Sequence, residues 1–112
     1  RRFLRAWLRD AAPVVTETRL LSNYPNPFNP ETWIPYQLAR DAEVQVTIYD
    51  IKGSVVRRLE LGHQRSGYYH DRGKAAYWDG RNEAGESVSS GVYFYQLRAG
   101  DFTAIKRMVI RK

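Results

Sequence analysis

Apolar and polar residues alternate along most of the chain from Thr32 onward. The clearest apolar positions at every second residue are Ile34, Tyr36 and Leu38, then Val44, Val46 and Ile48. A period of two places side chains on one face of a β-strand, so the pattern predicts half-buried strands with Arg40 and Asp41 in the turn between them. Pro35 lies inside the first strand, which predicts an edge strand or a bulge because proline cannot donate to a β-ladder.

Turn signals divide the remaining sequence into further short strands. Gly53 ends the turn 50–53, so residues 43–61 predict a β-hairpin. Residues 62–74 are polar and rich in glycine and predict a long connection, with a short strand near Tyr68 and Tyr69. Three more elements complete the pattern: a strand at 75–79, a turn-rich loop at 79–87 and a terminal hairpin at 91–111 divided at 98–101.

About seven short strands at regular spacing, with no βαβ pattern, predict an all-β fold. This count and spacing favour an antiparallel two-sheet β-sandwich over a barrel or an α/β fold, with Trp78 and the alternating aliphatic residues in its middle.

The first residues follow a different spacing. Phe3, Leu4, Trp7 and Leu8 recur at helical intervals with arginines on the other face, which predicts a short amphipathic helix over 3–10. Two turns bury too little apolar surface to hold a bilayer, so we expect this helix to end a preceding region or to pack on the sandwich. Residues 14–21 are expected to be a linker or an added edge strand. The predicted organisation is a helix and linker at 1–19 and a sandwich at 20–112.

The stretch NYPNPFNPETWIPY, residues 23–36, contains four prolines and three asparagines. Proline fixes φ and lacks an N–H, and asparagine before proline favours extended or turn geometry. This stretch is therefore expected to be neither a helix nor a central strand. It predicts a stiff lead-in to the first regular strand.

Composition bounds the fold and the partners. The chain has 112 residues, a mass of 13.1 kDa and 43% hydrophobic residues, which suits one domain with its own core. It has no cysteine, which excludes disulfides and thiolate chemistry, and no apolar run near the ~20 residues of a membrane span. The net charge is +6, but Arg1, Arg2, Arg5 and Arg9 supply much of the excess, and the other basic residues are interspersed with acids. We therefore expect no nucleic-acid partner.

The candidates for catalysis are few. His63 and His70 both fall in the predicted loop 62–74, without a nearby acidic cluster or a nucleophile. Catalysis by acid–base or covalent chemistry needs a nucleophile, a base within reach and a group that stabilises developing charge. The sequence therefore predicts a protein that is not an enzyme.

Two ligand classes remain as alternatives. Asp79, Asn82 and Glu86 place oxygen atoms on a tight loop that could hold calcium, although the loop departs from the EF-hand template. The favoured interpretation is a hairpin loop in which Asp79 and Asn82 accept hydrogen bonds from backbone amides, with no cofactor. A carbohydrate could instead stack on aromatic rings expected to face outward or to lie on loops: Trp33, Tyr49, Tyr68, Tyr69, Tyr77 and Phe94.

Four segments together resemble a known bacterial family. They are NYPNPFNPET, IYDIKGSVVRRL, WDGRNEAGESVSSGVYFYQL and the closing KRMVIRK, in order over about residues 20–112. The sequence is similar to the C-terminal domain of surface and secreted proteins: the type A sorting domain of the type IX secretion system, or the immunoglobulin-like domain of the flagellar hook-capping protein. The resemblance implies an immunoglobulin-like sandwich of seven strands. The positions that match its motifs are Pro25, Asn26, Pro27, Phe28, Gly53, Val56, Trp78, Asp79, Gly80, Gly85, Gly91, Val92 and Tyr93.

The resemblance also implies a function. It implies that a passenger domain precedes this one, that secretion machinery of the outer membrane recognises the folded sandwich, and that a sortase-like step attaches the passenger to surface lipopolysaccharide. The expected location is secreted or on the outer surface of a bacterium. The expected recognition residues lie on the last strand and tail: Lys106, Arg107, Arg111 and Lys112. The alternative is a structural spacer or assembly module that is not an address.

Overall fold

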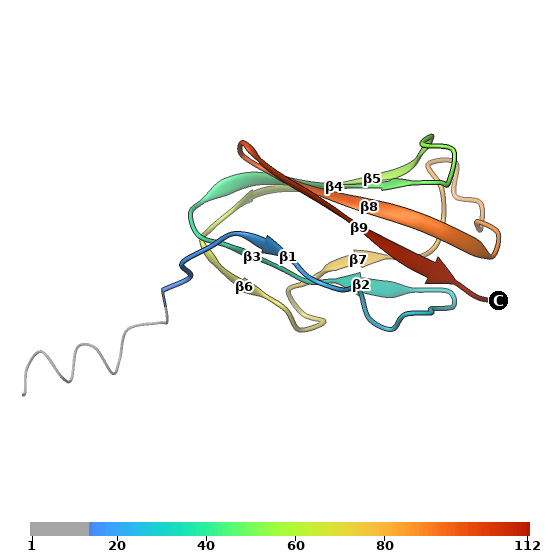
Figure 1. Ribbon diagram of the computed structural model, residues 1–112, viewed down its shortest axis with the longest axis horizontal. Coiled ribbons are helices and arrows are strands. Elements are labelled where there is room, and N and C mark those ends of the chain that lie inside the picture. The colour runs from blue at the N-terminus through green and yellow to red at the C-terminus, as the bar shows by residue number, and fades with distance from the viewer. Residues whose placement is uncertain (1–13) are drawn as a thin grey trace, which may run out of the picture.

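Strands account for most of the computed structural model, which describes residues 14–112 (Figure 1). In chain order they are β1 (Arg19–Leu20), β2 (Thr32–Ile34), β3 (Tyr36–Leu38), β4 (Ala42–Tyr49), β5 (Val55–Gln64), β6 (Gly67–Tyr69), β7 (Ala76–Trp78), β8 (Gly91–Ala99) and β9 (Phe102–Ile110). No helix occurs in this part of the chain, and so no helical membrane span is found there. The helix expected over 3–10 lies outside the described residues.

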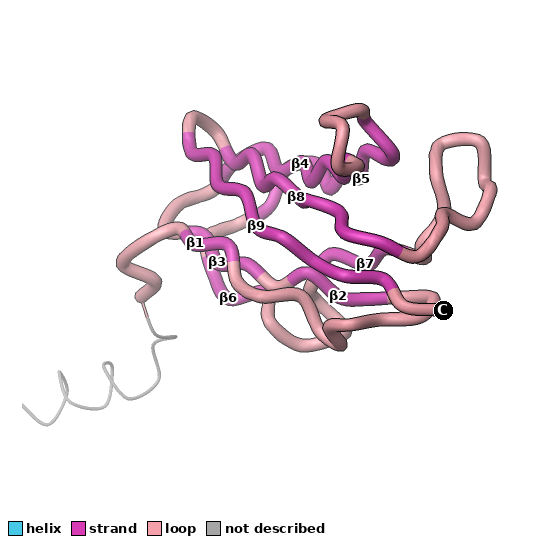
Figure 2. The backbone as a smooth tube through the Cα atoms, turned by 45° about the vertical axis from the view of Figure 1, so that its right-hand side comes forward, coloured by secondary structure: helices cyan, strands magenta, loops and turns pink. Residues whose placement is uncertain are grey.

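The strands form two layers. The longest strands make one antiparallel sheet in the order β5-β4-β8-β9. The second layer consists of two smaller sheets, β1-β3-β6 and β2-β7, which lie end to end beneath the first in both ribbon views (Figure 1 and Figure 2). The chain is therefore an antiparallel β-sandwich, as the alternation of apolar residues predicts.

The core lies between the layers and consists of the residues that the alternation places on the inner faces. Trp78, at 0% exposure, lies in it as expected. The other large side chains that are fully buried are Tyr36, Tyr95, Phe28, Ile34, Leu38, Ile48, Leu97, Met108, Ile110 and Val46. Each such aliphatic or aromatic side chain contributes about 1.5–3 kcal/mol through removal from water, so these faces hold the layers together.

Pro35 has a larger effect than the expected edge strand or bulge. It separates β2 from β3, and the two strands join different sheets: Trp33 is paired with Tyr77 of β7, whereas Gln37 is paired with Tyr68 of β6. Because proline has no N–H, the ladder is interrupted at this residue, and the chain passes from one small sheet to the other. The side chains before and after Pro35 still face the core.

The predicted long connection at 62–74 is wrong at its start, over residues 62–64. β5 continues to Gln64, and β6 begins at Gly67 after a turn closed by a 2.8 Å hydrogen bond from Ser66 N to Asp41 Oδ1. β5 is an edge strand with many exposed side chains, so its polar sequence resembles a loop. The short strand expected near Tyr68 and Tyr69 is present as β6.

The strand count also exceeds the expected seven. Residues 19–20 form β1 at the edge of the three-stranded sheet, which is the second of the two expectations for residues 14–21. The division of the first predicted strand at Pro35 adds another. These strands are two or three residues long, below the length at which alternation is recognisable in a sequence.

Candidate recognition surface

The proline-rich lead-in lies against the last strand of the sandwich. Phe28 N donates to Val109 O, and Arg111 N donates to Phe28 O, both at 3.0 Å, in a parallel bridge to the end of β9. The side chain of Asn26 extends this pairing, because its Oδ1 accepts a hydrogen bond from Val109 N at 3.0 Å. The lead-in therefore covers the edge of β9 at residues 109–111.

An aromatic stack fixes the lead-in from the core side. The ring of Phe28 contacts Trp78 edge-on, with centroids 5.6 Å apart, and Trp78 contacts Tyr93 in the same manner at 6.0 Å. Gly80 has φ +78°, and a Cβ at this position would lie 2.3 Å from Pro30 O. Only glycine allows the backbone after Trp78 to approach the lead-in so closely.

A buried polar contact, which sequence reasoning missed, holds the chain just before the lead-in. The hydroxyl of Tyr95 accepts a hydrogen bond from Asn23 N at 2.9 Å and donates to Leu21 O at 2.8 Å. The Asn23 side chain donates to Thr32 Oγ1 at 3.0 Å. Burial raises the pKa of Tyr95 to about 12, although the bond from Asn23 lowers it slightly. No local signal joins Asn23 to Tyr95, because they are 72 positions apart.

The loop at 79–87 is held together by the side chains considered for calcium. Asp79 Oδ1 accepts from Arg81 N at 3.0 Å and from Arg57 Nη1 at 3.1 Å. Asn82 Oδ1 accepts from the amides of Ala84 and Glu86, each at 3.0 Å. In the sequence 79–86, these oxygens therefore bond to backbone amides and to one arginine, which is the arrangement that the hairpin-loop interpretation predicts.

The same loop closes the opposite edge of the large sheet. Glu83 N donates to Val56 O at 3.1 Å, and the Glu83 carboxylate accepts from Arg58 N at 2.6 Å. These bonds replace the neighbour that the edge strand β5 lacks. The two edges of the sheet are thus covered at the same end of the sandwich, one by the lead-in and one by the loop 79–87.

The remaining motif positions belong to the framework of the large sheet. Gly53 lies in the turn between β4 and β5, where the carboxylate of Asp50 accepts hydrogen bonds from the amides at 52 and 54. Gly91 and Val92 begin β8 and pair with Ile110 and Val109 of β9. The matched positions therefore surround the ends of the strands and do not converge on a pocket.

The basic residues of the last strand and tail are all exposed: Lys106, Arg107, Arg111 and Lys112. Met108 and Ile110 are buried, and Arg107 lies on the opposite, outer face of β9, whereas Lys106 shares the face of Met108 and is exposed there. In residues 14–112 the ion pairs are Arg57–Asp79 at 3.1 Å and the contact of His63 with Glu43 at 3.7 Å. The four basic residues of the tail take part in neither.

The two histidines lie apart. His63 was expected in a loop but belongs to β5. Its Nδ1 faces the exposed carboxylate of Glu43. His70 lies beyond β6, where its carbonyl accepts a hydrogen bond from Tyr24 Oη and its ring contacts Tyr68. Within the described part of the chain, no three acidic or histidine side chains group as metal ligands would.

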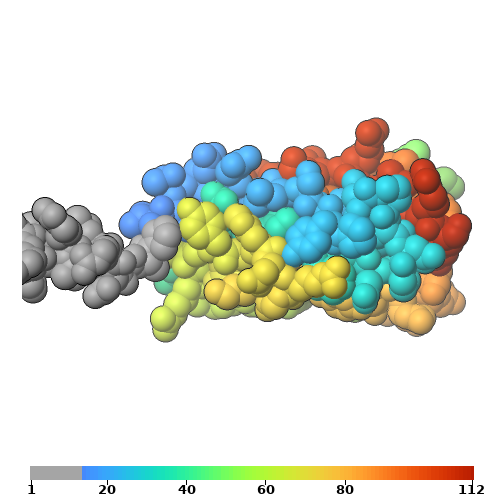
Figure 3. Space-filling model, turned by 90° about the horizontal axis from the view of Figure 1, so that it is seen from below, coloured from blue at the N-terminus to red at the C-terminus, as the bar shows by residue number. Residues whose placement is uncertain are grey.

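Two aromatic residues, Tyr24 and Tyr77, lie around Trp33 in a surface cluster. Its ring lies 6.4 Å from that of Tyr24 and 5.4 Å from that of Tyr77, and the Arg72 guanidinium lies 4.2 Å above it. Figure 3 shows the face on which the lead-in, in blue, meets the connection that contains Arg72, in yellow. Tyr77 and Tyr68 are exposed, but Trp33 is only half-buried and is covered by a cation–π contact.

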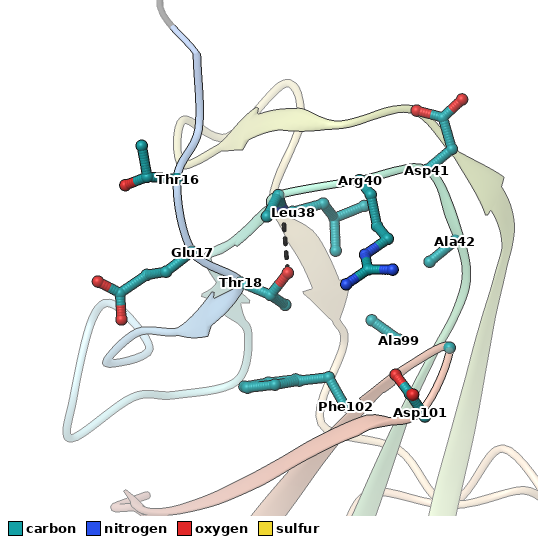
Figure 4. Close-up of a pocket in the computed structure, with 12 residues that line it drawn as sticks. Thr16, Glu17, Thr18, Leu38, Arg40, Asp41, Ala42, Ala99, Asp101 and Phe102 are labelled. Carbon is teal, nitrogen blue, oxygen red and sulfur yellow. Dashed lines mark hydrogen bonds between the residues drawn. The ribbon is translucent and has the colours of Figure 1, made fainter.

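A polar hollow of about 450 Å³ lies where the chain enters the sandwich (Figure 4). Residues before β1 form one wall, and Thr18 Oγ1 accepts a hydrogen bond from Ala39 N at 2.9 Å. Arg40 points into the hollow, whereas the carboxylates of Glu17 and Asp41 point away from it. The lining includes threonine hydroxyls and carboxylates but no histidine, cysteine or lysine.

The fold and the match to a known family together define the class of protein. The chain is an immunoglobulin-like antiparallel β-sandwich. Residues 30–101 match the FlgD Ig-like domain, which is well over half of the chain. The chain therefore belongs to the FlgD Ig-like domain family, in agreement with the resemblance found in its sequence.

Solved structures share the fold. Latent PorU from Porphyromonas gingivalis matches with a TM-score of 0.62 and 21% identity, over 90% of this chain and 10% of PorU. PorZ, an essential bacterial surface component of the type-IX secretion system of the same organism, matches with a TM-score of 0.56 and 19% identity, over 92% of this chain and 12% of PorZ. FlgD from P. aeruginosa matches with a TM-score of 0.58 and 20% identity, over 88% of this chain and 77% of FlgD. No curated protein matches the sequence.

Proposed function

We propose that this chain is a C-terminal module of a larger secreted bacterial protein, and that it acts as a secretion address and a surface-attachment domain. The observation on which the proposal depends is the shared fold of PorU and PorZ, in which a unit of this size is about a tenth of the chain. PorZ is itself a surface component of the type-IX secretion system. The implied location is outside the cell or on its outer surface, and the implied partners are the export machinery and a passenger in the same chain.

The exposed tail supports the choice of recognition residues. Lys106, Arg107, Arg111 and Lys112 are exposed and form no ion pair within residues 14–112, so their charges are available to steer an acidic receptor surface. The motif residues, by contrast, either cover the edges of the large sheet or belong to its turns, strands and core. In this proposal the motif residues keep the sandwich folded, and the export machinery recognises the basic residues of the tail.

A second candidate function is a spacer or assembly module. Membership of the FlgD Ig-like family favours it, because FlgD from P. aeruginosa has the same sandwich over most of its length. A spacer requires the fold but not the charges of the tail. The two candidates therefore differ in their response to substitutions that leave the core intact.

The test is an export assay with the whole chain fused behind a reporter in a bacterium that has the type IX machinery. An address increases the amount of reporter outside the cell relative to the reporter alone. Replacing Lys106, Arg107, Arg111 and Lys112 together by glutamine should remove that increase and leave the melting temperature unchanged. The matched control replaces four exposed basic residues elsewhere, Arg40, Arg58, Arg65 and Lys74, by glutamine. No export of the unmodified fusion would refute the address and favour the spacer, and equal export by both variants would refute recognition through the tail.

A further inference from the structure

The edge of β9 is covered along only part of its length. Val109 and Arg111 direct their backbone groups outward to the lead-in, and the pairing of β9 with β8 runs without interruption from Ile110 to Phe102. Backbone N–H and C=O groups alternate in direction along a strand. Those of Thr103, Ile105 and Arg107 therefore also point away from β8, towards the open edge of the sheet. In the described part of the chain, no other backbone group is hydrogen-bonded to these three.

Apolar side chains lie on the outer face beside this open edge. Ile105 is 58% exposed and borders a shallow groove of about 300 Å³. Phe94 of β8, Tyr49 of β4 and Ile51 of the following turn also line the groove, and Ile51 is 72% exposed. Exposed apolar groups that share one groove mark an interaction site more often than apolar residues scattered singly.

Basic residues outnumber acidic ones at this edge, where the acids are Asp101 in the turn before β9 and Asp50 in the groove, whose carboxylate already accepts two backbone hydrogen bonds. Lys106 and Arg107 are exposed on β9, and Arg98, opposite Thr103 on β8, is exposed beside them. A second copy of the chain that added its own β9 would bring two positively charged edges together, and their repulsion opposes such a pairing. Residues 1–13 are rich in arginine and are disfavoured on the same ground. An acidic occupant complements this edge.

We propose that residues 103–107 of β9 bind an extended, acidic segment of a partner protein, which adds to the large sheet as a further strand. This inference rests on the proposed function, for which it specifies the kind of segment that the export or attachment machinery presents. The chain itself shows that this edge accepts a strand, because Asn26 and Phe28 already pair with residues 109–111. Backbone hydrogen bonds provide affinity in strand addition, and alternate side chains provide specificity.

The geometry specifies the spacing of the partner's side chains. Ile105 and Arg107 lie on the same face of β9 two residues apart, so the partner strand should carry an apolar and an acidic side chain at the same interval. The apolar side chain would lie against Ile105 and the groove, and the carboxylate would face Arg107. A suitable probe is a soluble threonine peptide in which glutamate and valine are placed two residues apart. Its control carries glutamine in place of glutamate.

The main test removes one backbone N–H that points to the open edge of β9, and it keeps the backbone hydrogen bonds between β9 and β8. Ile105→Pro does so at the open edge, because proline is tolerated at an edge where the N–H faces solvent. The matched control is Glu60→Pro on β5, at the other edge of the same sheet, where the even-numbered positions face outward. Peptide titration followed by the backbone amide NMR signals of the full chain should show shifts at Thr103, Ile105 and Arg107. Ile105→Pro should weaken binding by about tenfold or more, and Glu60→Pro should leave it unchanged. The melting temperature of each variant checks that it is folded.

A charge variant tests the nature of the occupant. Arg107→Glu should weaken binding of the glutamate peptide about tenfold and should remove most of its dependence on salt, whereas Arg58→Glu on β5 should have little effect.

Equal loss in Ile105→Pro and Glu60→Pro, or amide shifts confined to other strands, would overturn the inference. So would a dimer of the unmodified chain that Ile105→Pro dissociates, because the edge would then be used by a second copy. Failure of the export assay with intact peptide binding would refute the proposed function alone. Normal export by a chain whose β9 edge binds no acidic peptide would refute this inference alone.

Discussion

Gly80 offers a direct test of how the lead-in is held. Its φ of +78° is unfavourable for any residue with a side chain, and an added Cβ would lie 2.3 Å from Pro30 O and 3.3 Å from Pro30 C. Gly85, in the same loop, has a similar φ of +83° but nothing within 4 Å of its Cβ position. Replacing each by alanine therefore separates the cost of the backbone conformation from the cost of the close approach.

The two substitutions should differ in size. Alanine in the left-handed region costs about 1–2 kcal/mol, and this cost applies to both positions. At Gly80 the methyl group also collides with the backbone carbonyl of Pro30, and relief of such a collision by backbone shifts costs about 1–3 kcal/mol. We expect Gly80→Ala to lower the free energy of unfolding by about 3 kcal/mol and Gly85→Ala by about 1 kcal/mol.

Urea unfolding followed by tryptophan fluorescence measures both values. With an m-value of about 2 kcal/mol/M, the midpoints of the two variants should differ by about 1 M. Gly80→Ala should also speed hydrogen exchange of the Val109 amide, because a displaced lead-in withdraws the Asn26 oxygen that accepts its hydrogen bond. Equal loss of stability in the two variants would refute the idea that Pro30 limits the space at Gly80.

The contacts of Phe28, Tyr95 and the loop 79–87 give three further predictions. Phe28→Ala should lower the free energy of unfolding by about 3–5 kcal/mol in thermal melts, because Phe28 is 2% exposed and packs against Trp78; a loss below about 1 kcal/mol would contradict this. Burial raises the pKa of Tyr95 to about 12, so the folded state holds this proton at a pH where the unfolded state releases it. Stability should therefore fall as pH rises from about 10 to 12, and Tyr95→Phe should be less stable at neutral pH but less sensitive to alkali, as chemical unfolding at each pH would show. Adding calcium should leave the melting temperature unchanged, because Asp79 and Asn82 already accept internal hydrogen bonds; a rise would instead assign a site to this loop.

The sequence is informative wherever a strand has one buried and one exposed face. Val44, Val46 and Ile48 alternate with polar residues because β4 lies at the centre of the large sheet with its other face outward, and the prediction there is correct. Pro35 was correctly expected to disturb its strand. The partner of each half could not be predicted, because alternation records which face is buried and not which strand lies alongside.

Other features depend on residues far apart in the chain. Only the end of β5, residues 62–64, was predicted as a loop, because an edge strand with exposed side chains lacks alternation. The contact between Asn23 and Tyr95 and the pairing of Asn26 with Val109 join the two ends of the sequence, and nothing in the local sequence distinguishes these asparagines from turn residues. The open edge of β9 likewise follows only from knowing where the lead-in stops.

The parallel pairing of the lead-in with β9 has a mechanical consequence. Phe28 and Asn26 precede the body of the sandwich and Val109 and Arg111 end it, and the two segments run in the same direction. A pull that draws the two ends of the chain apart slides these segments along each other, so the three hydrogen bonds between them resist in shear and must break together. Once the contacts of β1 and Asn23 have given way to such a pull, this pairing would yield abruptly instead of opening one hydrogen bond at a time.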